Sequence, residues 1–515
     1  MESFIVAARN DGFGERMCAM LNAMYIAKKT GWTFKFIWQD PPKLENNDQN
    51  VLLPWNDMLP QDLTFSREFI NKYALKNSPS CNDTLIKTNS HKTLQEAIRN
   101  PGKYEWGGGH YSLQEYLAEY FTDIEQKEYA NTLQECWNEI KFSSNIQHSI
   151  TLAKQCKNLP KNFIAIHIRC GDIFINGDIY LARHKAVNVC LVLEIIQKEI
   201  QEDKEIILFS DDLEMLNTIK QQTNMKFGNK VFIIDDFFKR EQHTKLEQSI
   251  FEIMAMSQAT KIYSGISGFS RLANMIGNNK HITIYRFFDS KAQYKITQQL
   301  ITQYALPPTH EAFAYLHLFD LIKDLKNTQN LQASYIQKAY SLEPNITALK
   351  VLLVYTLLQN KNFKEANQEL KTIYHSHKSS YLNELLREGW KRAGILLYDF
   401  TFSGYFQAKP IESFPYIAYF SYIIASKTLN HHYLKCLYKY NPKFYFAILK
   451  SLPNFNRVFI AAKQIDPNLP TLSIDIPTKS KQIKLLIQYL IHKNFKKLKN
   501  SLNKKYRKIT KLFTQ

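Results

Sequence analysis

The stretch Asn162–Asp172, NFIAIHIRCGD, decides how the rest of the chain is interpreted. An apolar run brings His167 and Arg169 to alternate positions and then gives way to the polar turn CGD. This pattern predicts a buried strand that ends in a loop. Ligands of open α/β sheets bind at the carboxyl ends of strands, and the guanidinium of Arg169 can donate two parallel hydrogen bonds to a phosphate. The stretch therefore predicts a nucleotide or phosphate site.

Composition indicates a folded protein with several domains and an uneven charge. At roughly 150 residues per domain, 515 residues predict about three domains. Hydrophobic residues at 45% and charged residues at 22% are ordinary for globular proteins, so most of the chain should fold. The net charge of +19 is concentrated in Thr478–Gln515, which contains no Asp or Glu. The overall basicity is therefore no argument that the folded domains bind nucleic acid.

The cysteines and the first residues indicate an intracellular protein. The seven cysteines are widely spaced and form no CxxC pair, which argues against a disulfide framework and against a structural zinc site. The start, MESFIVAARNDG, lacks the basic region and the long apolar core of a signal peptide. No stretch reaches the length of a membrane-spanning helix.

A second motif lies at the start of the chain. Residues 3–8 predict a strand, the glycine-containing loop DGFGER follows, and residues 17–29 have the spacing of a helix. Free backbone N–H groups at such a helix start can bind an anion or a sugar hydroxyl. The alternative is a tight turn that only connects two elements. A second glycine loop, 106–111, is expected to be flexible and to precede a helix, and His110 in it is given no catalytic role.

From residue 155 to about 290 the chain alternates between strands and helices. Strands are expected at 205–209, 231–234, 261–263 and 281–285, with helices at 185–202, 245–258 and 272–276. This alternation predicts a parallel, doubly wound sheet. The strand ends carry Arg169 and Asp172, Asp211 and Asp212, Asp235 and Asp236, and Ser267 and Ser270. These side chains can converge on one crevice, although each could instead only cap a helix or terminate a strand.

These residues resemble a known family. HIRCGD resembles the HxRxGD-type motif of the α-1,2- and α-1,6-fucosyltransferase and protein O-fucosyltransferase superfamily, and the likeness extends to DGFGER, FSDD and SGFSRLA. It covers roughly the first 290 residues. The resemblance implies an α/β fold of GT-B type, in which two Rossmann-like domains face a cleft. It also implies GDP-fucose as the donor, transfer with inversion, and no metal or other cofactor.

The resemblance also assigns roles to individual residues. Arg169 would hold the β-phosphate of GDP, and Asp211 or Asp212 would lie near the guanosine. The remaining donor-site residues would be His167, Asp172, Ser267 and Ser270, and the acceptor or donor loop would contain Gly12, Gly14 and Arg16. Cys170 stands where several family members have a second basic residue, so the sugar carried by the donor stays open.

The charge that develops on the leaving group suggests a mechanism for sugar transfer. Breaking a bond between a sugar and a diphosphate builds negative charge on the leaving group, and a fixed cation such as Arg169 stabilises that transition state. The acceptor hydroxyl needs at most weak deprotonation if the sugar is already cation-like, so a carboxylate could be the base, and Asp11 and Glu15 are the candidates. The acceptor is expected to be a glycan, such as a cell-surface polysaccharide or a lipopolysaccharide.

The remaining chain is expected to be helical. The predicted domains are 1–154, an acceptor-side α/β domain; 155–297, a Rossmann-like donor domain; 298–477, a helical region; and 478–515, a basic tail. Residues 331–375 resemble tetratricopeptide repeats, although an irregular helical domain fits as well. A scaffold or glycan-binding protein that is not catalytic is therefore the alternative function.

The tail 478–515 has an apolar stripe at helical spacing between its lysines. Binding to an anionic membrane surface ranks first, packing on the helical region second, and nucleic-acid binding last. This ranking predicts a cytoplasmic protein at the inner face of the inner membrane, where a lipid-linked acceptor would be within reach.

Overall fold

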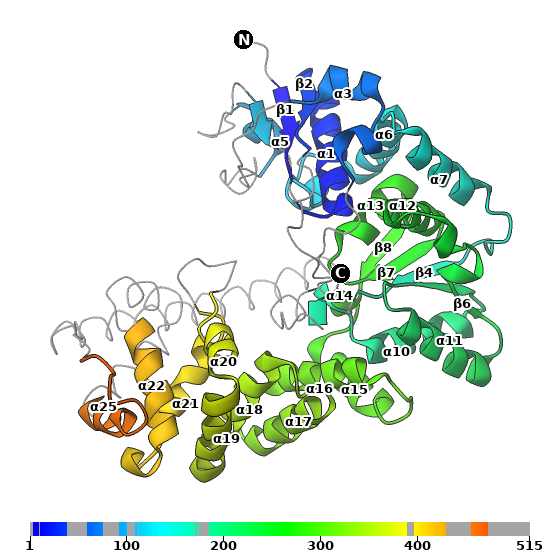
Figure 1. The fold of residues 1–515 in the computed structure, drawn as a ribbon. Coiled ribbons are helices and arrows are strands. Elements are labelled where there is room, and N and C mark those ends of the chain that lie inside the picture. The colour runs from blue at the N-terminus through cyan, green and yellow to red at the C-terminus, as the bar shows by residue number, and fades with distance from the viewer. Residues whose placement is uncertain are drawn as a thin grey trace, which may run out of the picture. The chain divides into compact units, whose positions relative to one another are not determined.

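The computed structural model describes residues 4–9, 11–38, 59–75, 92–99, 109–111, 113–169, 173–174, 185–388, 396–428 and 455–471. The chain divides into two compact units, Met1–Leu321 and Ile322–Gln515 (Figure 1). The first unit contains two parallel sheets and the helices that cover them. The expectation of an α/β protein with parallel strands is therefore confirmed. A GT-B arrangement of two domains stays a prediction.

The first sheet has the strand order β2-β1-β3. The central strand β1, Phe4–Ala7, pairs in parallel with β2, Thr33–Phe36, and with β3, Gly109–Tyr111. Helix α1, Phe13–Thr30, connects β1 to β2 and ends at Gly31, which adopts the left-handed conformation that glycine tolerates best (φ 74°).

The structure corrects the last part of the loop that was expected at 106–111, whose first residues, 106–108, lie outside the described residues. Gly109–Tyr111 form strand β3, because pairing with β1 satisfies backbone groups that a loop would leave to water. The helix expected directly behind this loop is only the 3-10 turn Leu117–Glu119, and the next α-helix is α6, Gln126–Glu139, which packs on α1.

The second sheet has the strand order β6-β5-β4-β7-β8, and all four pairings are parallel. Its strands are β4 (Ile164–His167), β5 (Ile206–Phe209), β6 (Val231–Ile233), β7 (Lys261–Ser264) and β8 (Lys280–Thr283). Helices α10 (Val189–Gln201) and α11 (Leu213–Phe227) lie on one side of the sheet, and α12 (Lys245–Met256) and α13 (Gly268–Gly277) on the other (Figure 1). The chain changes direction across the sheet at β4, so β4 and β7 border the switch point.

The apolar run before Arg169, which predicted a buried strand, forms β4. Every residue of β4 and β5 is buried, as expected for parallel strands that helices cover on both faces. The start of one helix differs from the expectation. Helix α10 begins at Val189 and not at Lys185, because the Asn188 side chain accepts a hydrogen bond from Cys190 N at 3.0 Å and caps the helix there.

The two sheets are joined where α1 and α13 begin. A Cβ atom placed on Gly14 would lie 2.6 Å from the carbonyl carbon of Gly268, and one on Gly268 would lie 2.8 Å from the backbone nitrogen of Glu15. The two helix backbones therefore touch, which only glycine permits. One hydrophobic core runs through this junction, from Ile5 in β1 to Ile276 in α13.

The remaining helices of the first unit lie around these sheets. Their bounds are α2 Gln61–Thr64, α3 Arg67–Tyr73, α5 Leu94–Arg99, α7 Ser144–Gln155, α14 Ile284–Phe287, α15 Ser290–Leu300 and α16 Pro308–Ile322. Helix α7 packs on α12, and α15 packs on α10.

The described part of the second unit is helical except for one isolated bridge, between Glu388 and Leu396. Its helices are α17 Gln329–Leu342, α18 Thr347–Gln359, α19 Phe363–Ser376, α20 Lys378–Leu385, α21 Phe402–Tyr405, α22 Pro415–Thr428 and α25 Phe455–Lys463. Consecutive helices pack on each other, as α17 does on α18 and α18 on α19. A tetratricopeptide relationship stays a prediction.

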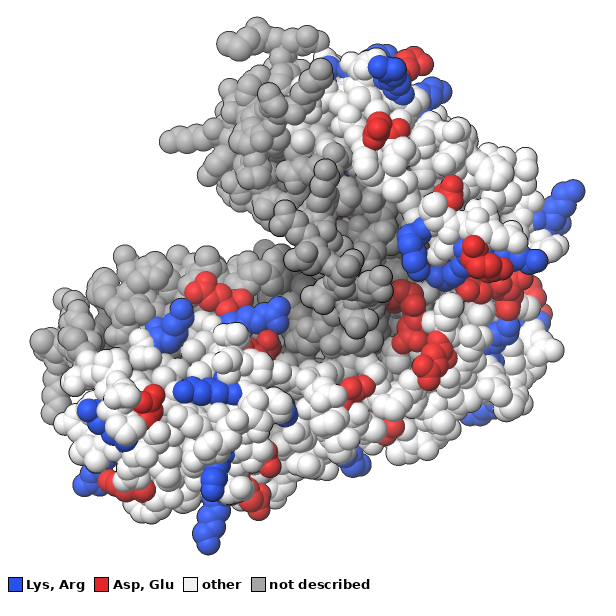
Figure 2. Space-filling view, in the orientation of Figure 1, with Lys and Arg blue, Asp and Glu red and all other residues white. Residues whose placement is uncertain are grey.

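Charges of both signs are interspersed on the described surface that Figure 2 shows. The most basic stretch of the sequence, 478–515, lies outside the described residues. Among the helices that are described, none has the length and apolar character needed to cross a bilayer.

We predict that Gly14→Ala lowers the free energy of unfolding by about 3 kcal/mol, because the added methyl group meets backbone atoms that cannot rotate away. Gly31→Ala is the matched control. Its methyl group meets open space, so only the left-handed backbone costs stability, roughly 1 kcal/mol. Urea unfolding of both variants checks this order. Equal losses would mean that the two backbones do not touch.

Candidate functional site

The candidate site lies where α1 and α13 begin, at the carboxyl ends of β1, β4 and β7. The first turn of each helix leaves backbone N–H groups without partners in the helix, and such groups attract anions. Helix α1 starts after Gly12, which has no side chain to cap it. Helix α13 is capped by Ser267, whose buried Oγ accepts a hydrogen bond from Phe269 N at 3.2 Å. The amide groups of two helix starts thus lie close together.

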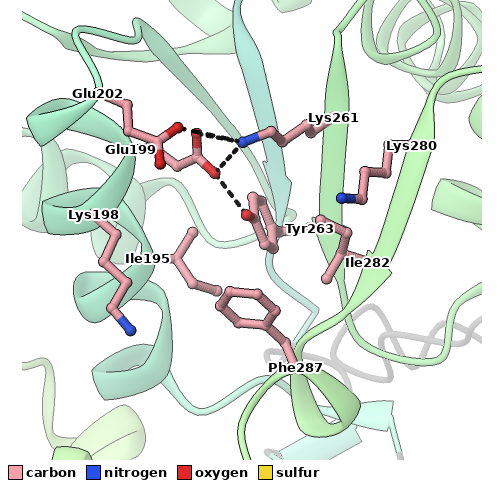
Figure 3. A pocket seen from close by; sticks show the side chains of 9 residues that line it. All are labelled: Ile195, Lys198, Glu199, Glu202, Lys261, Tyr263, Lys280, Ile282 and Phe287. Carbon is pink, nitrogen blue, oxygen red and sulfur yellow. Dashed lines mark hydrogen bonds and ion pairs between the residues drawn. The ribbon is translucent and has the colours of Figure 1, made fainter. Parts of the chain in front are cut away.

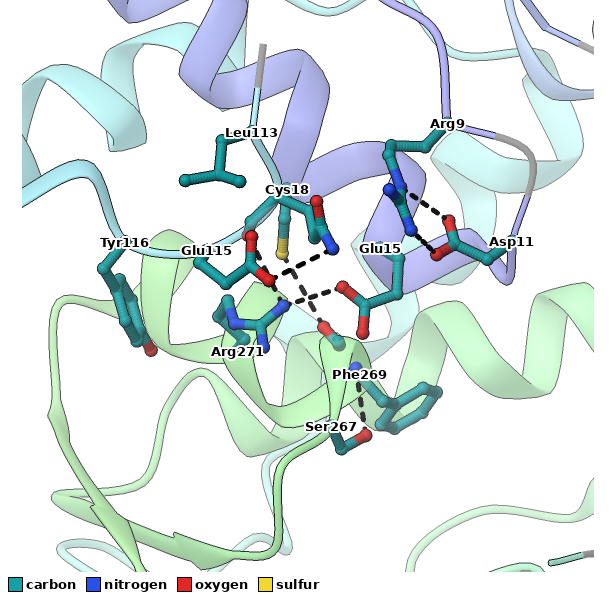
Figure 4. A network of polar contacts seen from close by, with 12 residues as sticks. Arg9, Asp11, Glu15, Cys18, Leu113, Glu115, Tyr116, Ser267, Phe269 and Arg271 are labelled. Carbon is teal, nitrogen blue, oxygen red and sulfur yellow. Dashed lines mark hydrogen bonds and ion pairs between the residues drawn. The ribbon is translucent and has the colours of Figure 1, made fainter. Parts of the chain in front are cut away.

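Arginines from both sheets surround this place, and two of them form ion pairs (Figure 4). The guanidinium of Arg271, which is buried, lies 2.7 Å from the carboxylate of Glu15 and so ties α13 to α1. Arg9 forms an ion pair with Asp11 in the loop before α1.

The predicted loop residue Arg16 has a structural role in this loop. Its Nε donates to the backbone oxygen of Asp11 at 2.6 Å. Its guanidinium also lies over the ring of Trp38, 5.0 Å from the centroid. Arg16 therefore fixes the shape of the glycine loop from within.

Arg169, just beyond the end of β4, lies beside a cation that the sequence did not reveal. Burial and the positive charge of Arg169 lower the pKa of the Lys185 ammonium, although Glu15 and Asp11 act in the opposite direction. No described residue forms a hydrogen bond or an ion pair with this ammonium group. The Lys185 backbone is fixed against the end of β7, because a Cβ atom on Gly265 would lie 2.6 Å from the Lys185 carbonyl oxygen. The only signal in the sequence was the basic run RHK before α10.

His167, the last residue of β4, is neutral at physiological pH. Burial, together with the charges of Arg169 and His281, lowers the pKa of His167 to about 3. Its ring stacks on Phe269, with centroids 5.2 Å apart. Its Nδ1 atom is buried and has no hydrogen-bond partner in the described part of the chain, so it could bind a polar group of a ligand.

Ser270, a predicted donor-site residue, belongs to a buried chain of polar groups. Its Oγ donates to Ser264 Oγ at 2.8 Å, and Ser264 Oγ lies 2.8 Å from His281 Nε2. The other nitrogen of His281 lies 2.9 Å from the hydroxyl of Tyr116, in the segment after β3. This series of polar contacts connects the two sheets, and the Ser270 hydroxyl is a hydrogen-bond donor within it. A role of Ser267 or Ser270 toward a diphosphate stays a prediction.

The two aspartates after β5 have different surroundings. Asp212 caps α11 by accepting from Met215 N at 3.0 Å, and its other oxygen lies 2.8 Å from Nε2 of the buried His310. The hydrogen bond from His310 is the main cause that lowers the pKa of Asp212. Asp211 is exposed. Its Oδ1 accepts a hydrogen bond from Ser210 Oγ at 3.3 Å.

The other predicted site residues divide into two groups. Asp11 and Glu15, the candidate bases, lie in the site, where each forms an ion pair with an arginine. Their role stays a prediction. Cys170 and Asp172 lie outside the described residues. In the described parts of the chain, no group of three His, Cys, Asp or Glu residues is arranged to hold a metal ion.

A cavity of about 220 Å³ lies at the opposite edge of the second sheet, near the amino ends of β7 and β8 (Figure 3). Glu199, which is buried, accepts a hydrogen bond from Tyr263 at 2.6 Å and lies 2.9 Å from the ammonium group of Lys261. These polar groups satisfy one another. We therefore interpret them as structural contacts that link α10 to β7.

Comparisons with known proteins give only distant likenesses. No family model matches the chain, and no curated protein matches it. The NodZ α-1,6-fucosyltransferase soaked with GDP-fucose is 14% identical, with 54% of this chain and 93% of that chain covered and a TM-score of 0.30. The fucosyltransferase NodZ from Bradyrhizobium is 15% identical, with 53% and 93% covered and a TM-score of 0.28. POFUT1 in complex with GDP-fucose is 10% identical, with 54% and 96% covered and a TM-score of 0.29. TM-scores this low do not support a fold or a function for this chain.

We predict that Asp212→Asn and Asp211→Asn differ in stability. Asn caps a helix as well as Asp, so Asp212→Asn loses mainly the charged hydrogen bond with His310, about 1–2 kcal/mol at pH 7. Asp211→Asn, at an exposed position, should change stability by less than about 0.5 kcal/mol.

The pH dependence of Asp212→Asn gives the control. Because the folded protein lowers the pKa of Asp212, its contribution is complete above the ordinary Asp value of about 4 and is lost as the pH falls below it. The difference between wild type and Asp212→Asn in thermal unfolding should therefore shrink below pH 4. A difference that stays constant down to pH 2 would contradict this assignment.

Proposed function

We propose that the protein is a glycosyltransferase that moves a sugar from a nucleotide diphosphate onto a glycan acceptor. The observation that carries this proposal is the half-buried ammonium of Lys185, unpaired among the described residues and next to Arg169 and two helix starts. The positive charge of Arg169 disfavours the charged form of Lys185, and an anion bound beside Lys185 would offset this effect. A diphosphate is an anion of suitable size and charge.

The charges of the site support a donor with a leaving group of high negative charge. Arg9 and Arg271 are already balanced by Asp11 and Glu15. The charge of Lys185 has no such counterpart among the described carboxylates, so a bound diphosphate would meet uncompensated positive charge. Negative charge that grows on the diphosphate as the bond to the sugar breaks would be stabilised by Arg169, Lys185 and the helix amides. Lys185 could supply the second cation that Cys170 cannot.

The finer parts of the proposal depend on the resemblance of the sequence motifs. HIRCGD, DGFGER, FSDD and SGFSRLA suggest GDP-fucose as the donor, transfer with inversion and no metal. A cell-surface polysaccharide or a lipopolysaccharide is the acceptor class that we propose. The neutral ring of His167, stacked on Phe269, would form an uncharged wall of the donor pocket.

We predict that the wild type binds GDP in calorimetry and that Arg169→Ala weakens binding by about 30-fold or more, roughly 2 kcal/mol, through loss of charged hydrogen bonds. Lys185→Met should weaken GDP binding by about tenfold for the same reason. Lys280→Met is the matched control, because Lys280 is an exposed lysine at the opposite edge of the same sheet. It should leave the affinity unchanged.

Two results would count against the proposed donor site. Absence of GDP binding by the wild type would favour a scaffold or glycan-binding protein without catalysis. Equal effects of Lys185→Met and Lys280→Met would remove Lys185 from the donor site. A panel of nucleotide sugars, tested for hydrolysis and for protection against thermal unfolding, would identify the donor.

The membrane role of the tail is a separate proposal, because 478–515 lies outside the described residues. The full-length protein should sediment with vesicles that contain phosphatidylglycerol, and a variant without 478–515 should stay in solution, since the lysines of the tail are attracted to anionic lipid. Phosphatidylcholine vesicles serve as the control. Retention of the shortened variant on the anionic vesicles would overturn the membrane role.

A further inference from the structure

A third carboxylate, Glu115, lies in the site and was not expected from the sequence. Glu115 comes after β3 and therefore lies beyond the carboxyl edge of the first sheet, as Asp11 does after β1. The guanidinium of Arg9 interacts electrostatically with Asp11, Glu15 and Glu115. The three carboxylates therefore border one place, and Figure 4 shows Glu115 near Arg271.

Glu115 differs from the other two acids in its partners. Asp11 and Glu15 each form an ion pair with an arginine. Glu115 has no such partner in the described chain: its Oε1 accepts only a hydrogen bond from the neutral Gln114 Nε2, at 3.2 Å. The Glu115 Oε2 atom is buried and has no hydrogen-bond partner among the described residues, and the same is true of Gln114 Oε1.

Two adjacent buried acceptors without a donor are costly in a folded protein. They persist where a ligand supplies the missing donors, and hydroxyl groups are donors of this kind. The segment 113–115 is also held in place from two sides. The Asn22 side chain donates to Leu113 O at 2.5 Å and to Glu115 O at 2.8 Å, and Arg271 donates to Gln114 O at 3.4 Å. The acceptors are thus positioned before any ligand arrives.

We propose that Glu115 is the catalytic base of the sugar transfer and that Gln114 Oε1 accepts a hydrogen bond from a second hydroxyl of the acceptor. This inference rests on the proposed function. Glu115 Oε2 takes the proton of the attacking hydroxyl while that oxygen bonds to the anomeric carbon. The bond from this carbon to the diphosphate breaks, and its electron pair leaves with the diphosphate. Glu115 then releases the proton to water.

Asp11 and Glu15 have structural roles in this arrangement. Glu15 holds Arg271 between the two sheets, and Asp11 holds the loop through Arg9 and Arg16. Glu115 differs from both because it forms no ion pair among the described residues. Glu115 can act without breaking any ion pair.

The test compares Glu115→Gln with Glu119→Gln, a matched change at an exposed glutamate in the same segment. Hydrolysis of the nucleotide-sugar panel, with water as the acceptor, reports the chemical step, and calorimetry with GDP reports donor binding. Glu115→Gln should lower kcat by about 10²–10⁴-fold with GDP affinity unchanged, and Glu119→Gln should behave as wild type.

Thermal unfolding gives a readout that does not depend on activity. Glu115 forms no ion pair among the described residues, so Glu115→Gln should leave the melting temperature nearly unchanged. A lowered melting temperature, or wild-type kcat in Glu115→Gln, overturns the inference about Glu115 alone. A wild type that neither binds GDP nor hydrolyses any nucleotide sugar overturns the proposed function, and this inference with it.

Discussion

The contact between Gly14 and Gly268 is the constraint on which the first unit depends. Two helices that belong to different sheets begin at this contact, and their backbones approach too closely for any side chain between them. The ion pair between Glu15 and Arg271 spans the same junction. Because it is largely buried, this pair is worth more for fixing the geometry than for net stability. The contact between the two glycines sets the distance between α1 and α13, and the ion pair sets how the two helices are oriented.

The electrostatics of the site follow from that junction. Bringing two helix starts together gathers positive partial charges, and arginines from both sheets add full charges. Internal carboxylates balance part of this charge, while Lys185 stays without an acid of its own in the described chain. His167 stays neutral throughout the physiological range, so it adds no charge to the site at cellular pH. The chemistry of the site therefore depends on fixed cations and on carboxylates with different partners.

The local parts of this organisation could be predicted from the sequence. The apolar run before Arg169 predicted β4, and the alternation of strands and helices predicted parallel pairing, because both patterns are set by neighbours in the chain. Strand β3 was missed because two of its residues are not typical strand formers, and only pairing with β1 makes them a strand. Lys185 and Glu115 were missed for a different reason. Both are singled out because they form no ion pair in the described chain, and a sequence does not show which acid pairs with which base.

The two glycines also bear on how such a site could diverge. At most positions a larger side chain on one element can be accommodated by a smaller one on its neighbour. Here each glycine is already the smallest residue and faces backbone, so no compensating change exists at the other position. The pair should thus persist in related chains even where the motifs around it have drifted. Two glycines at the starts of two helices from separate sheets would be a more durable marker of this architecture than any of its charged residues.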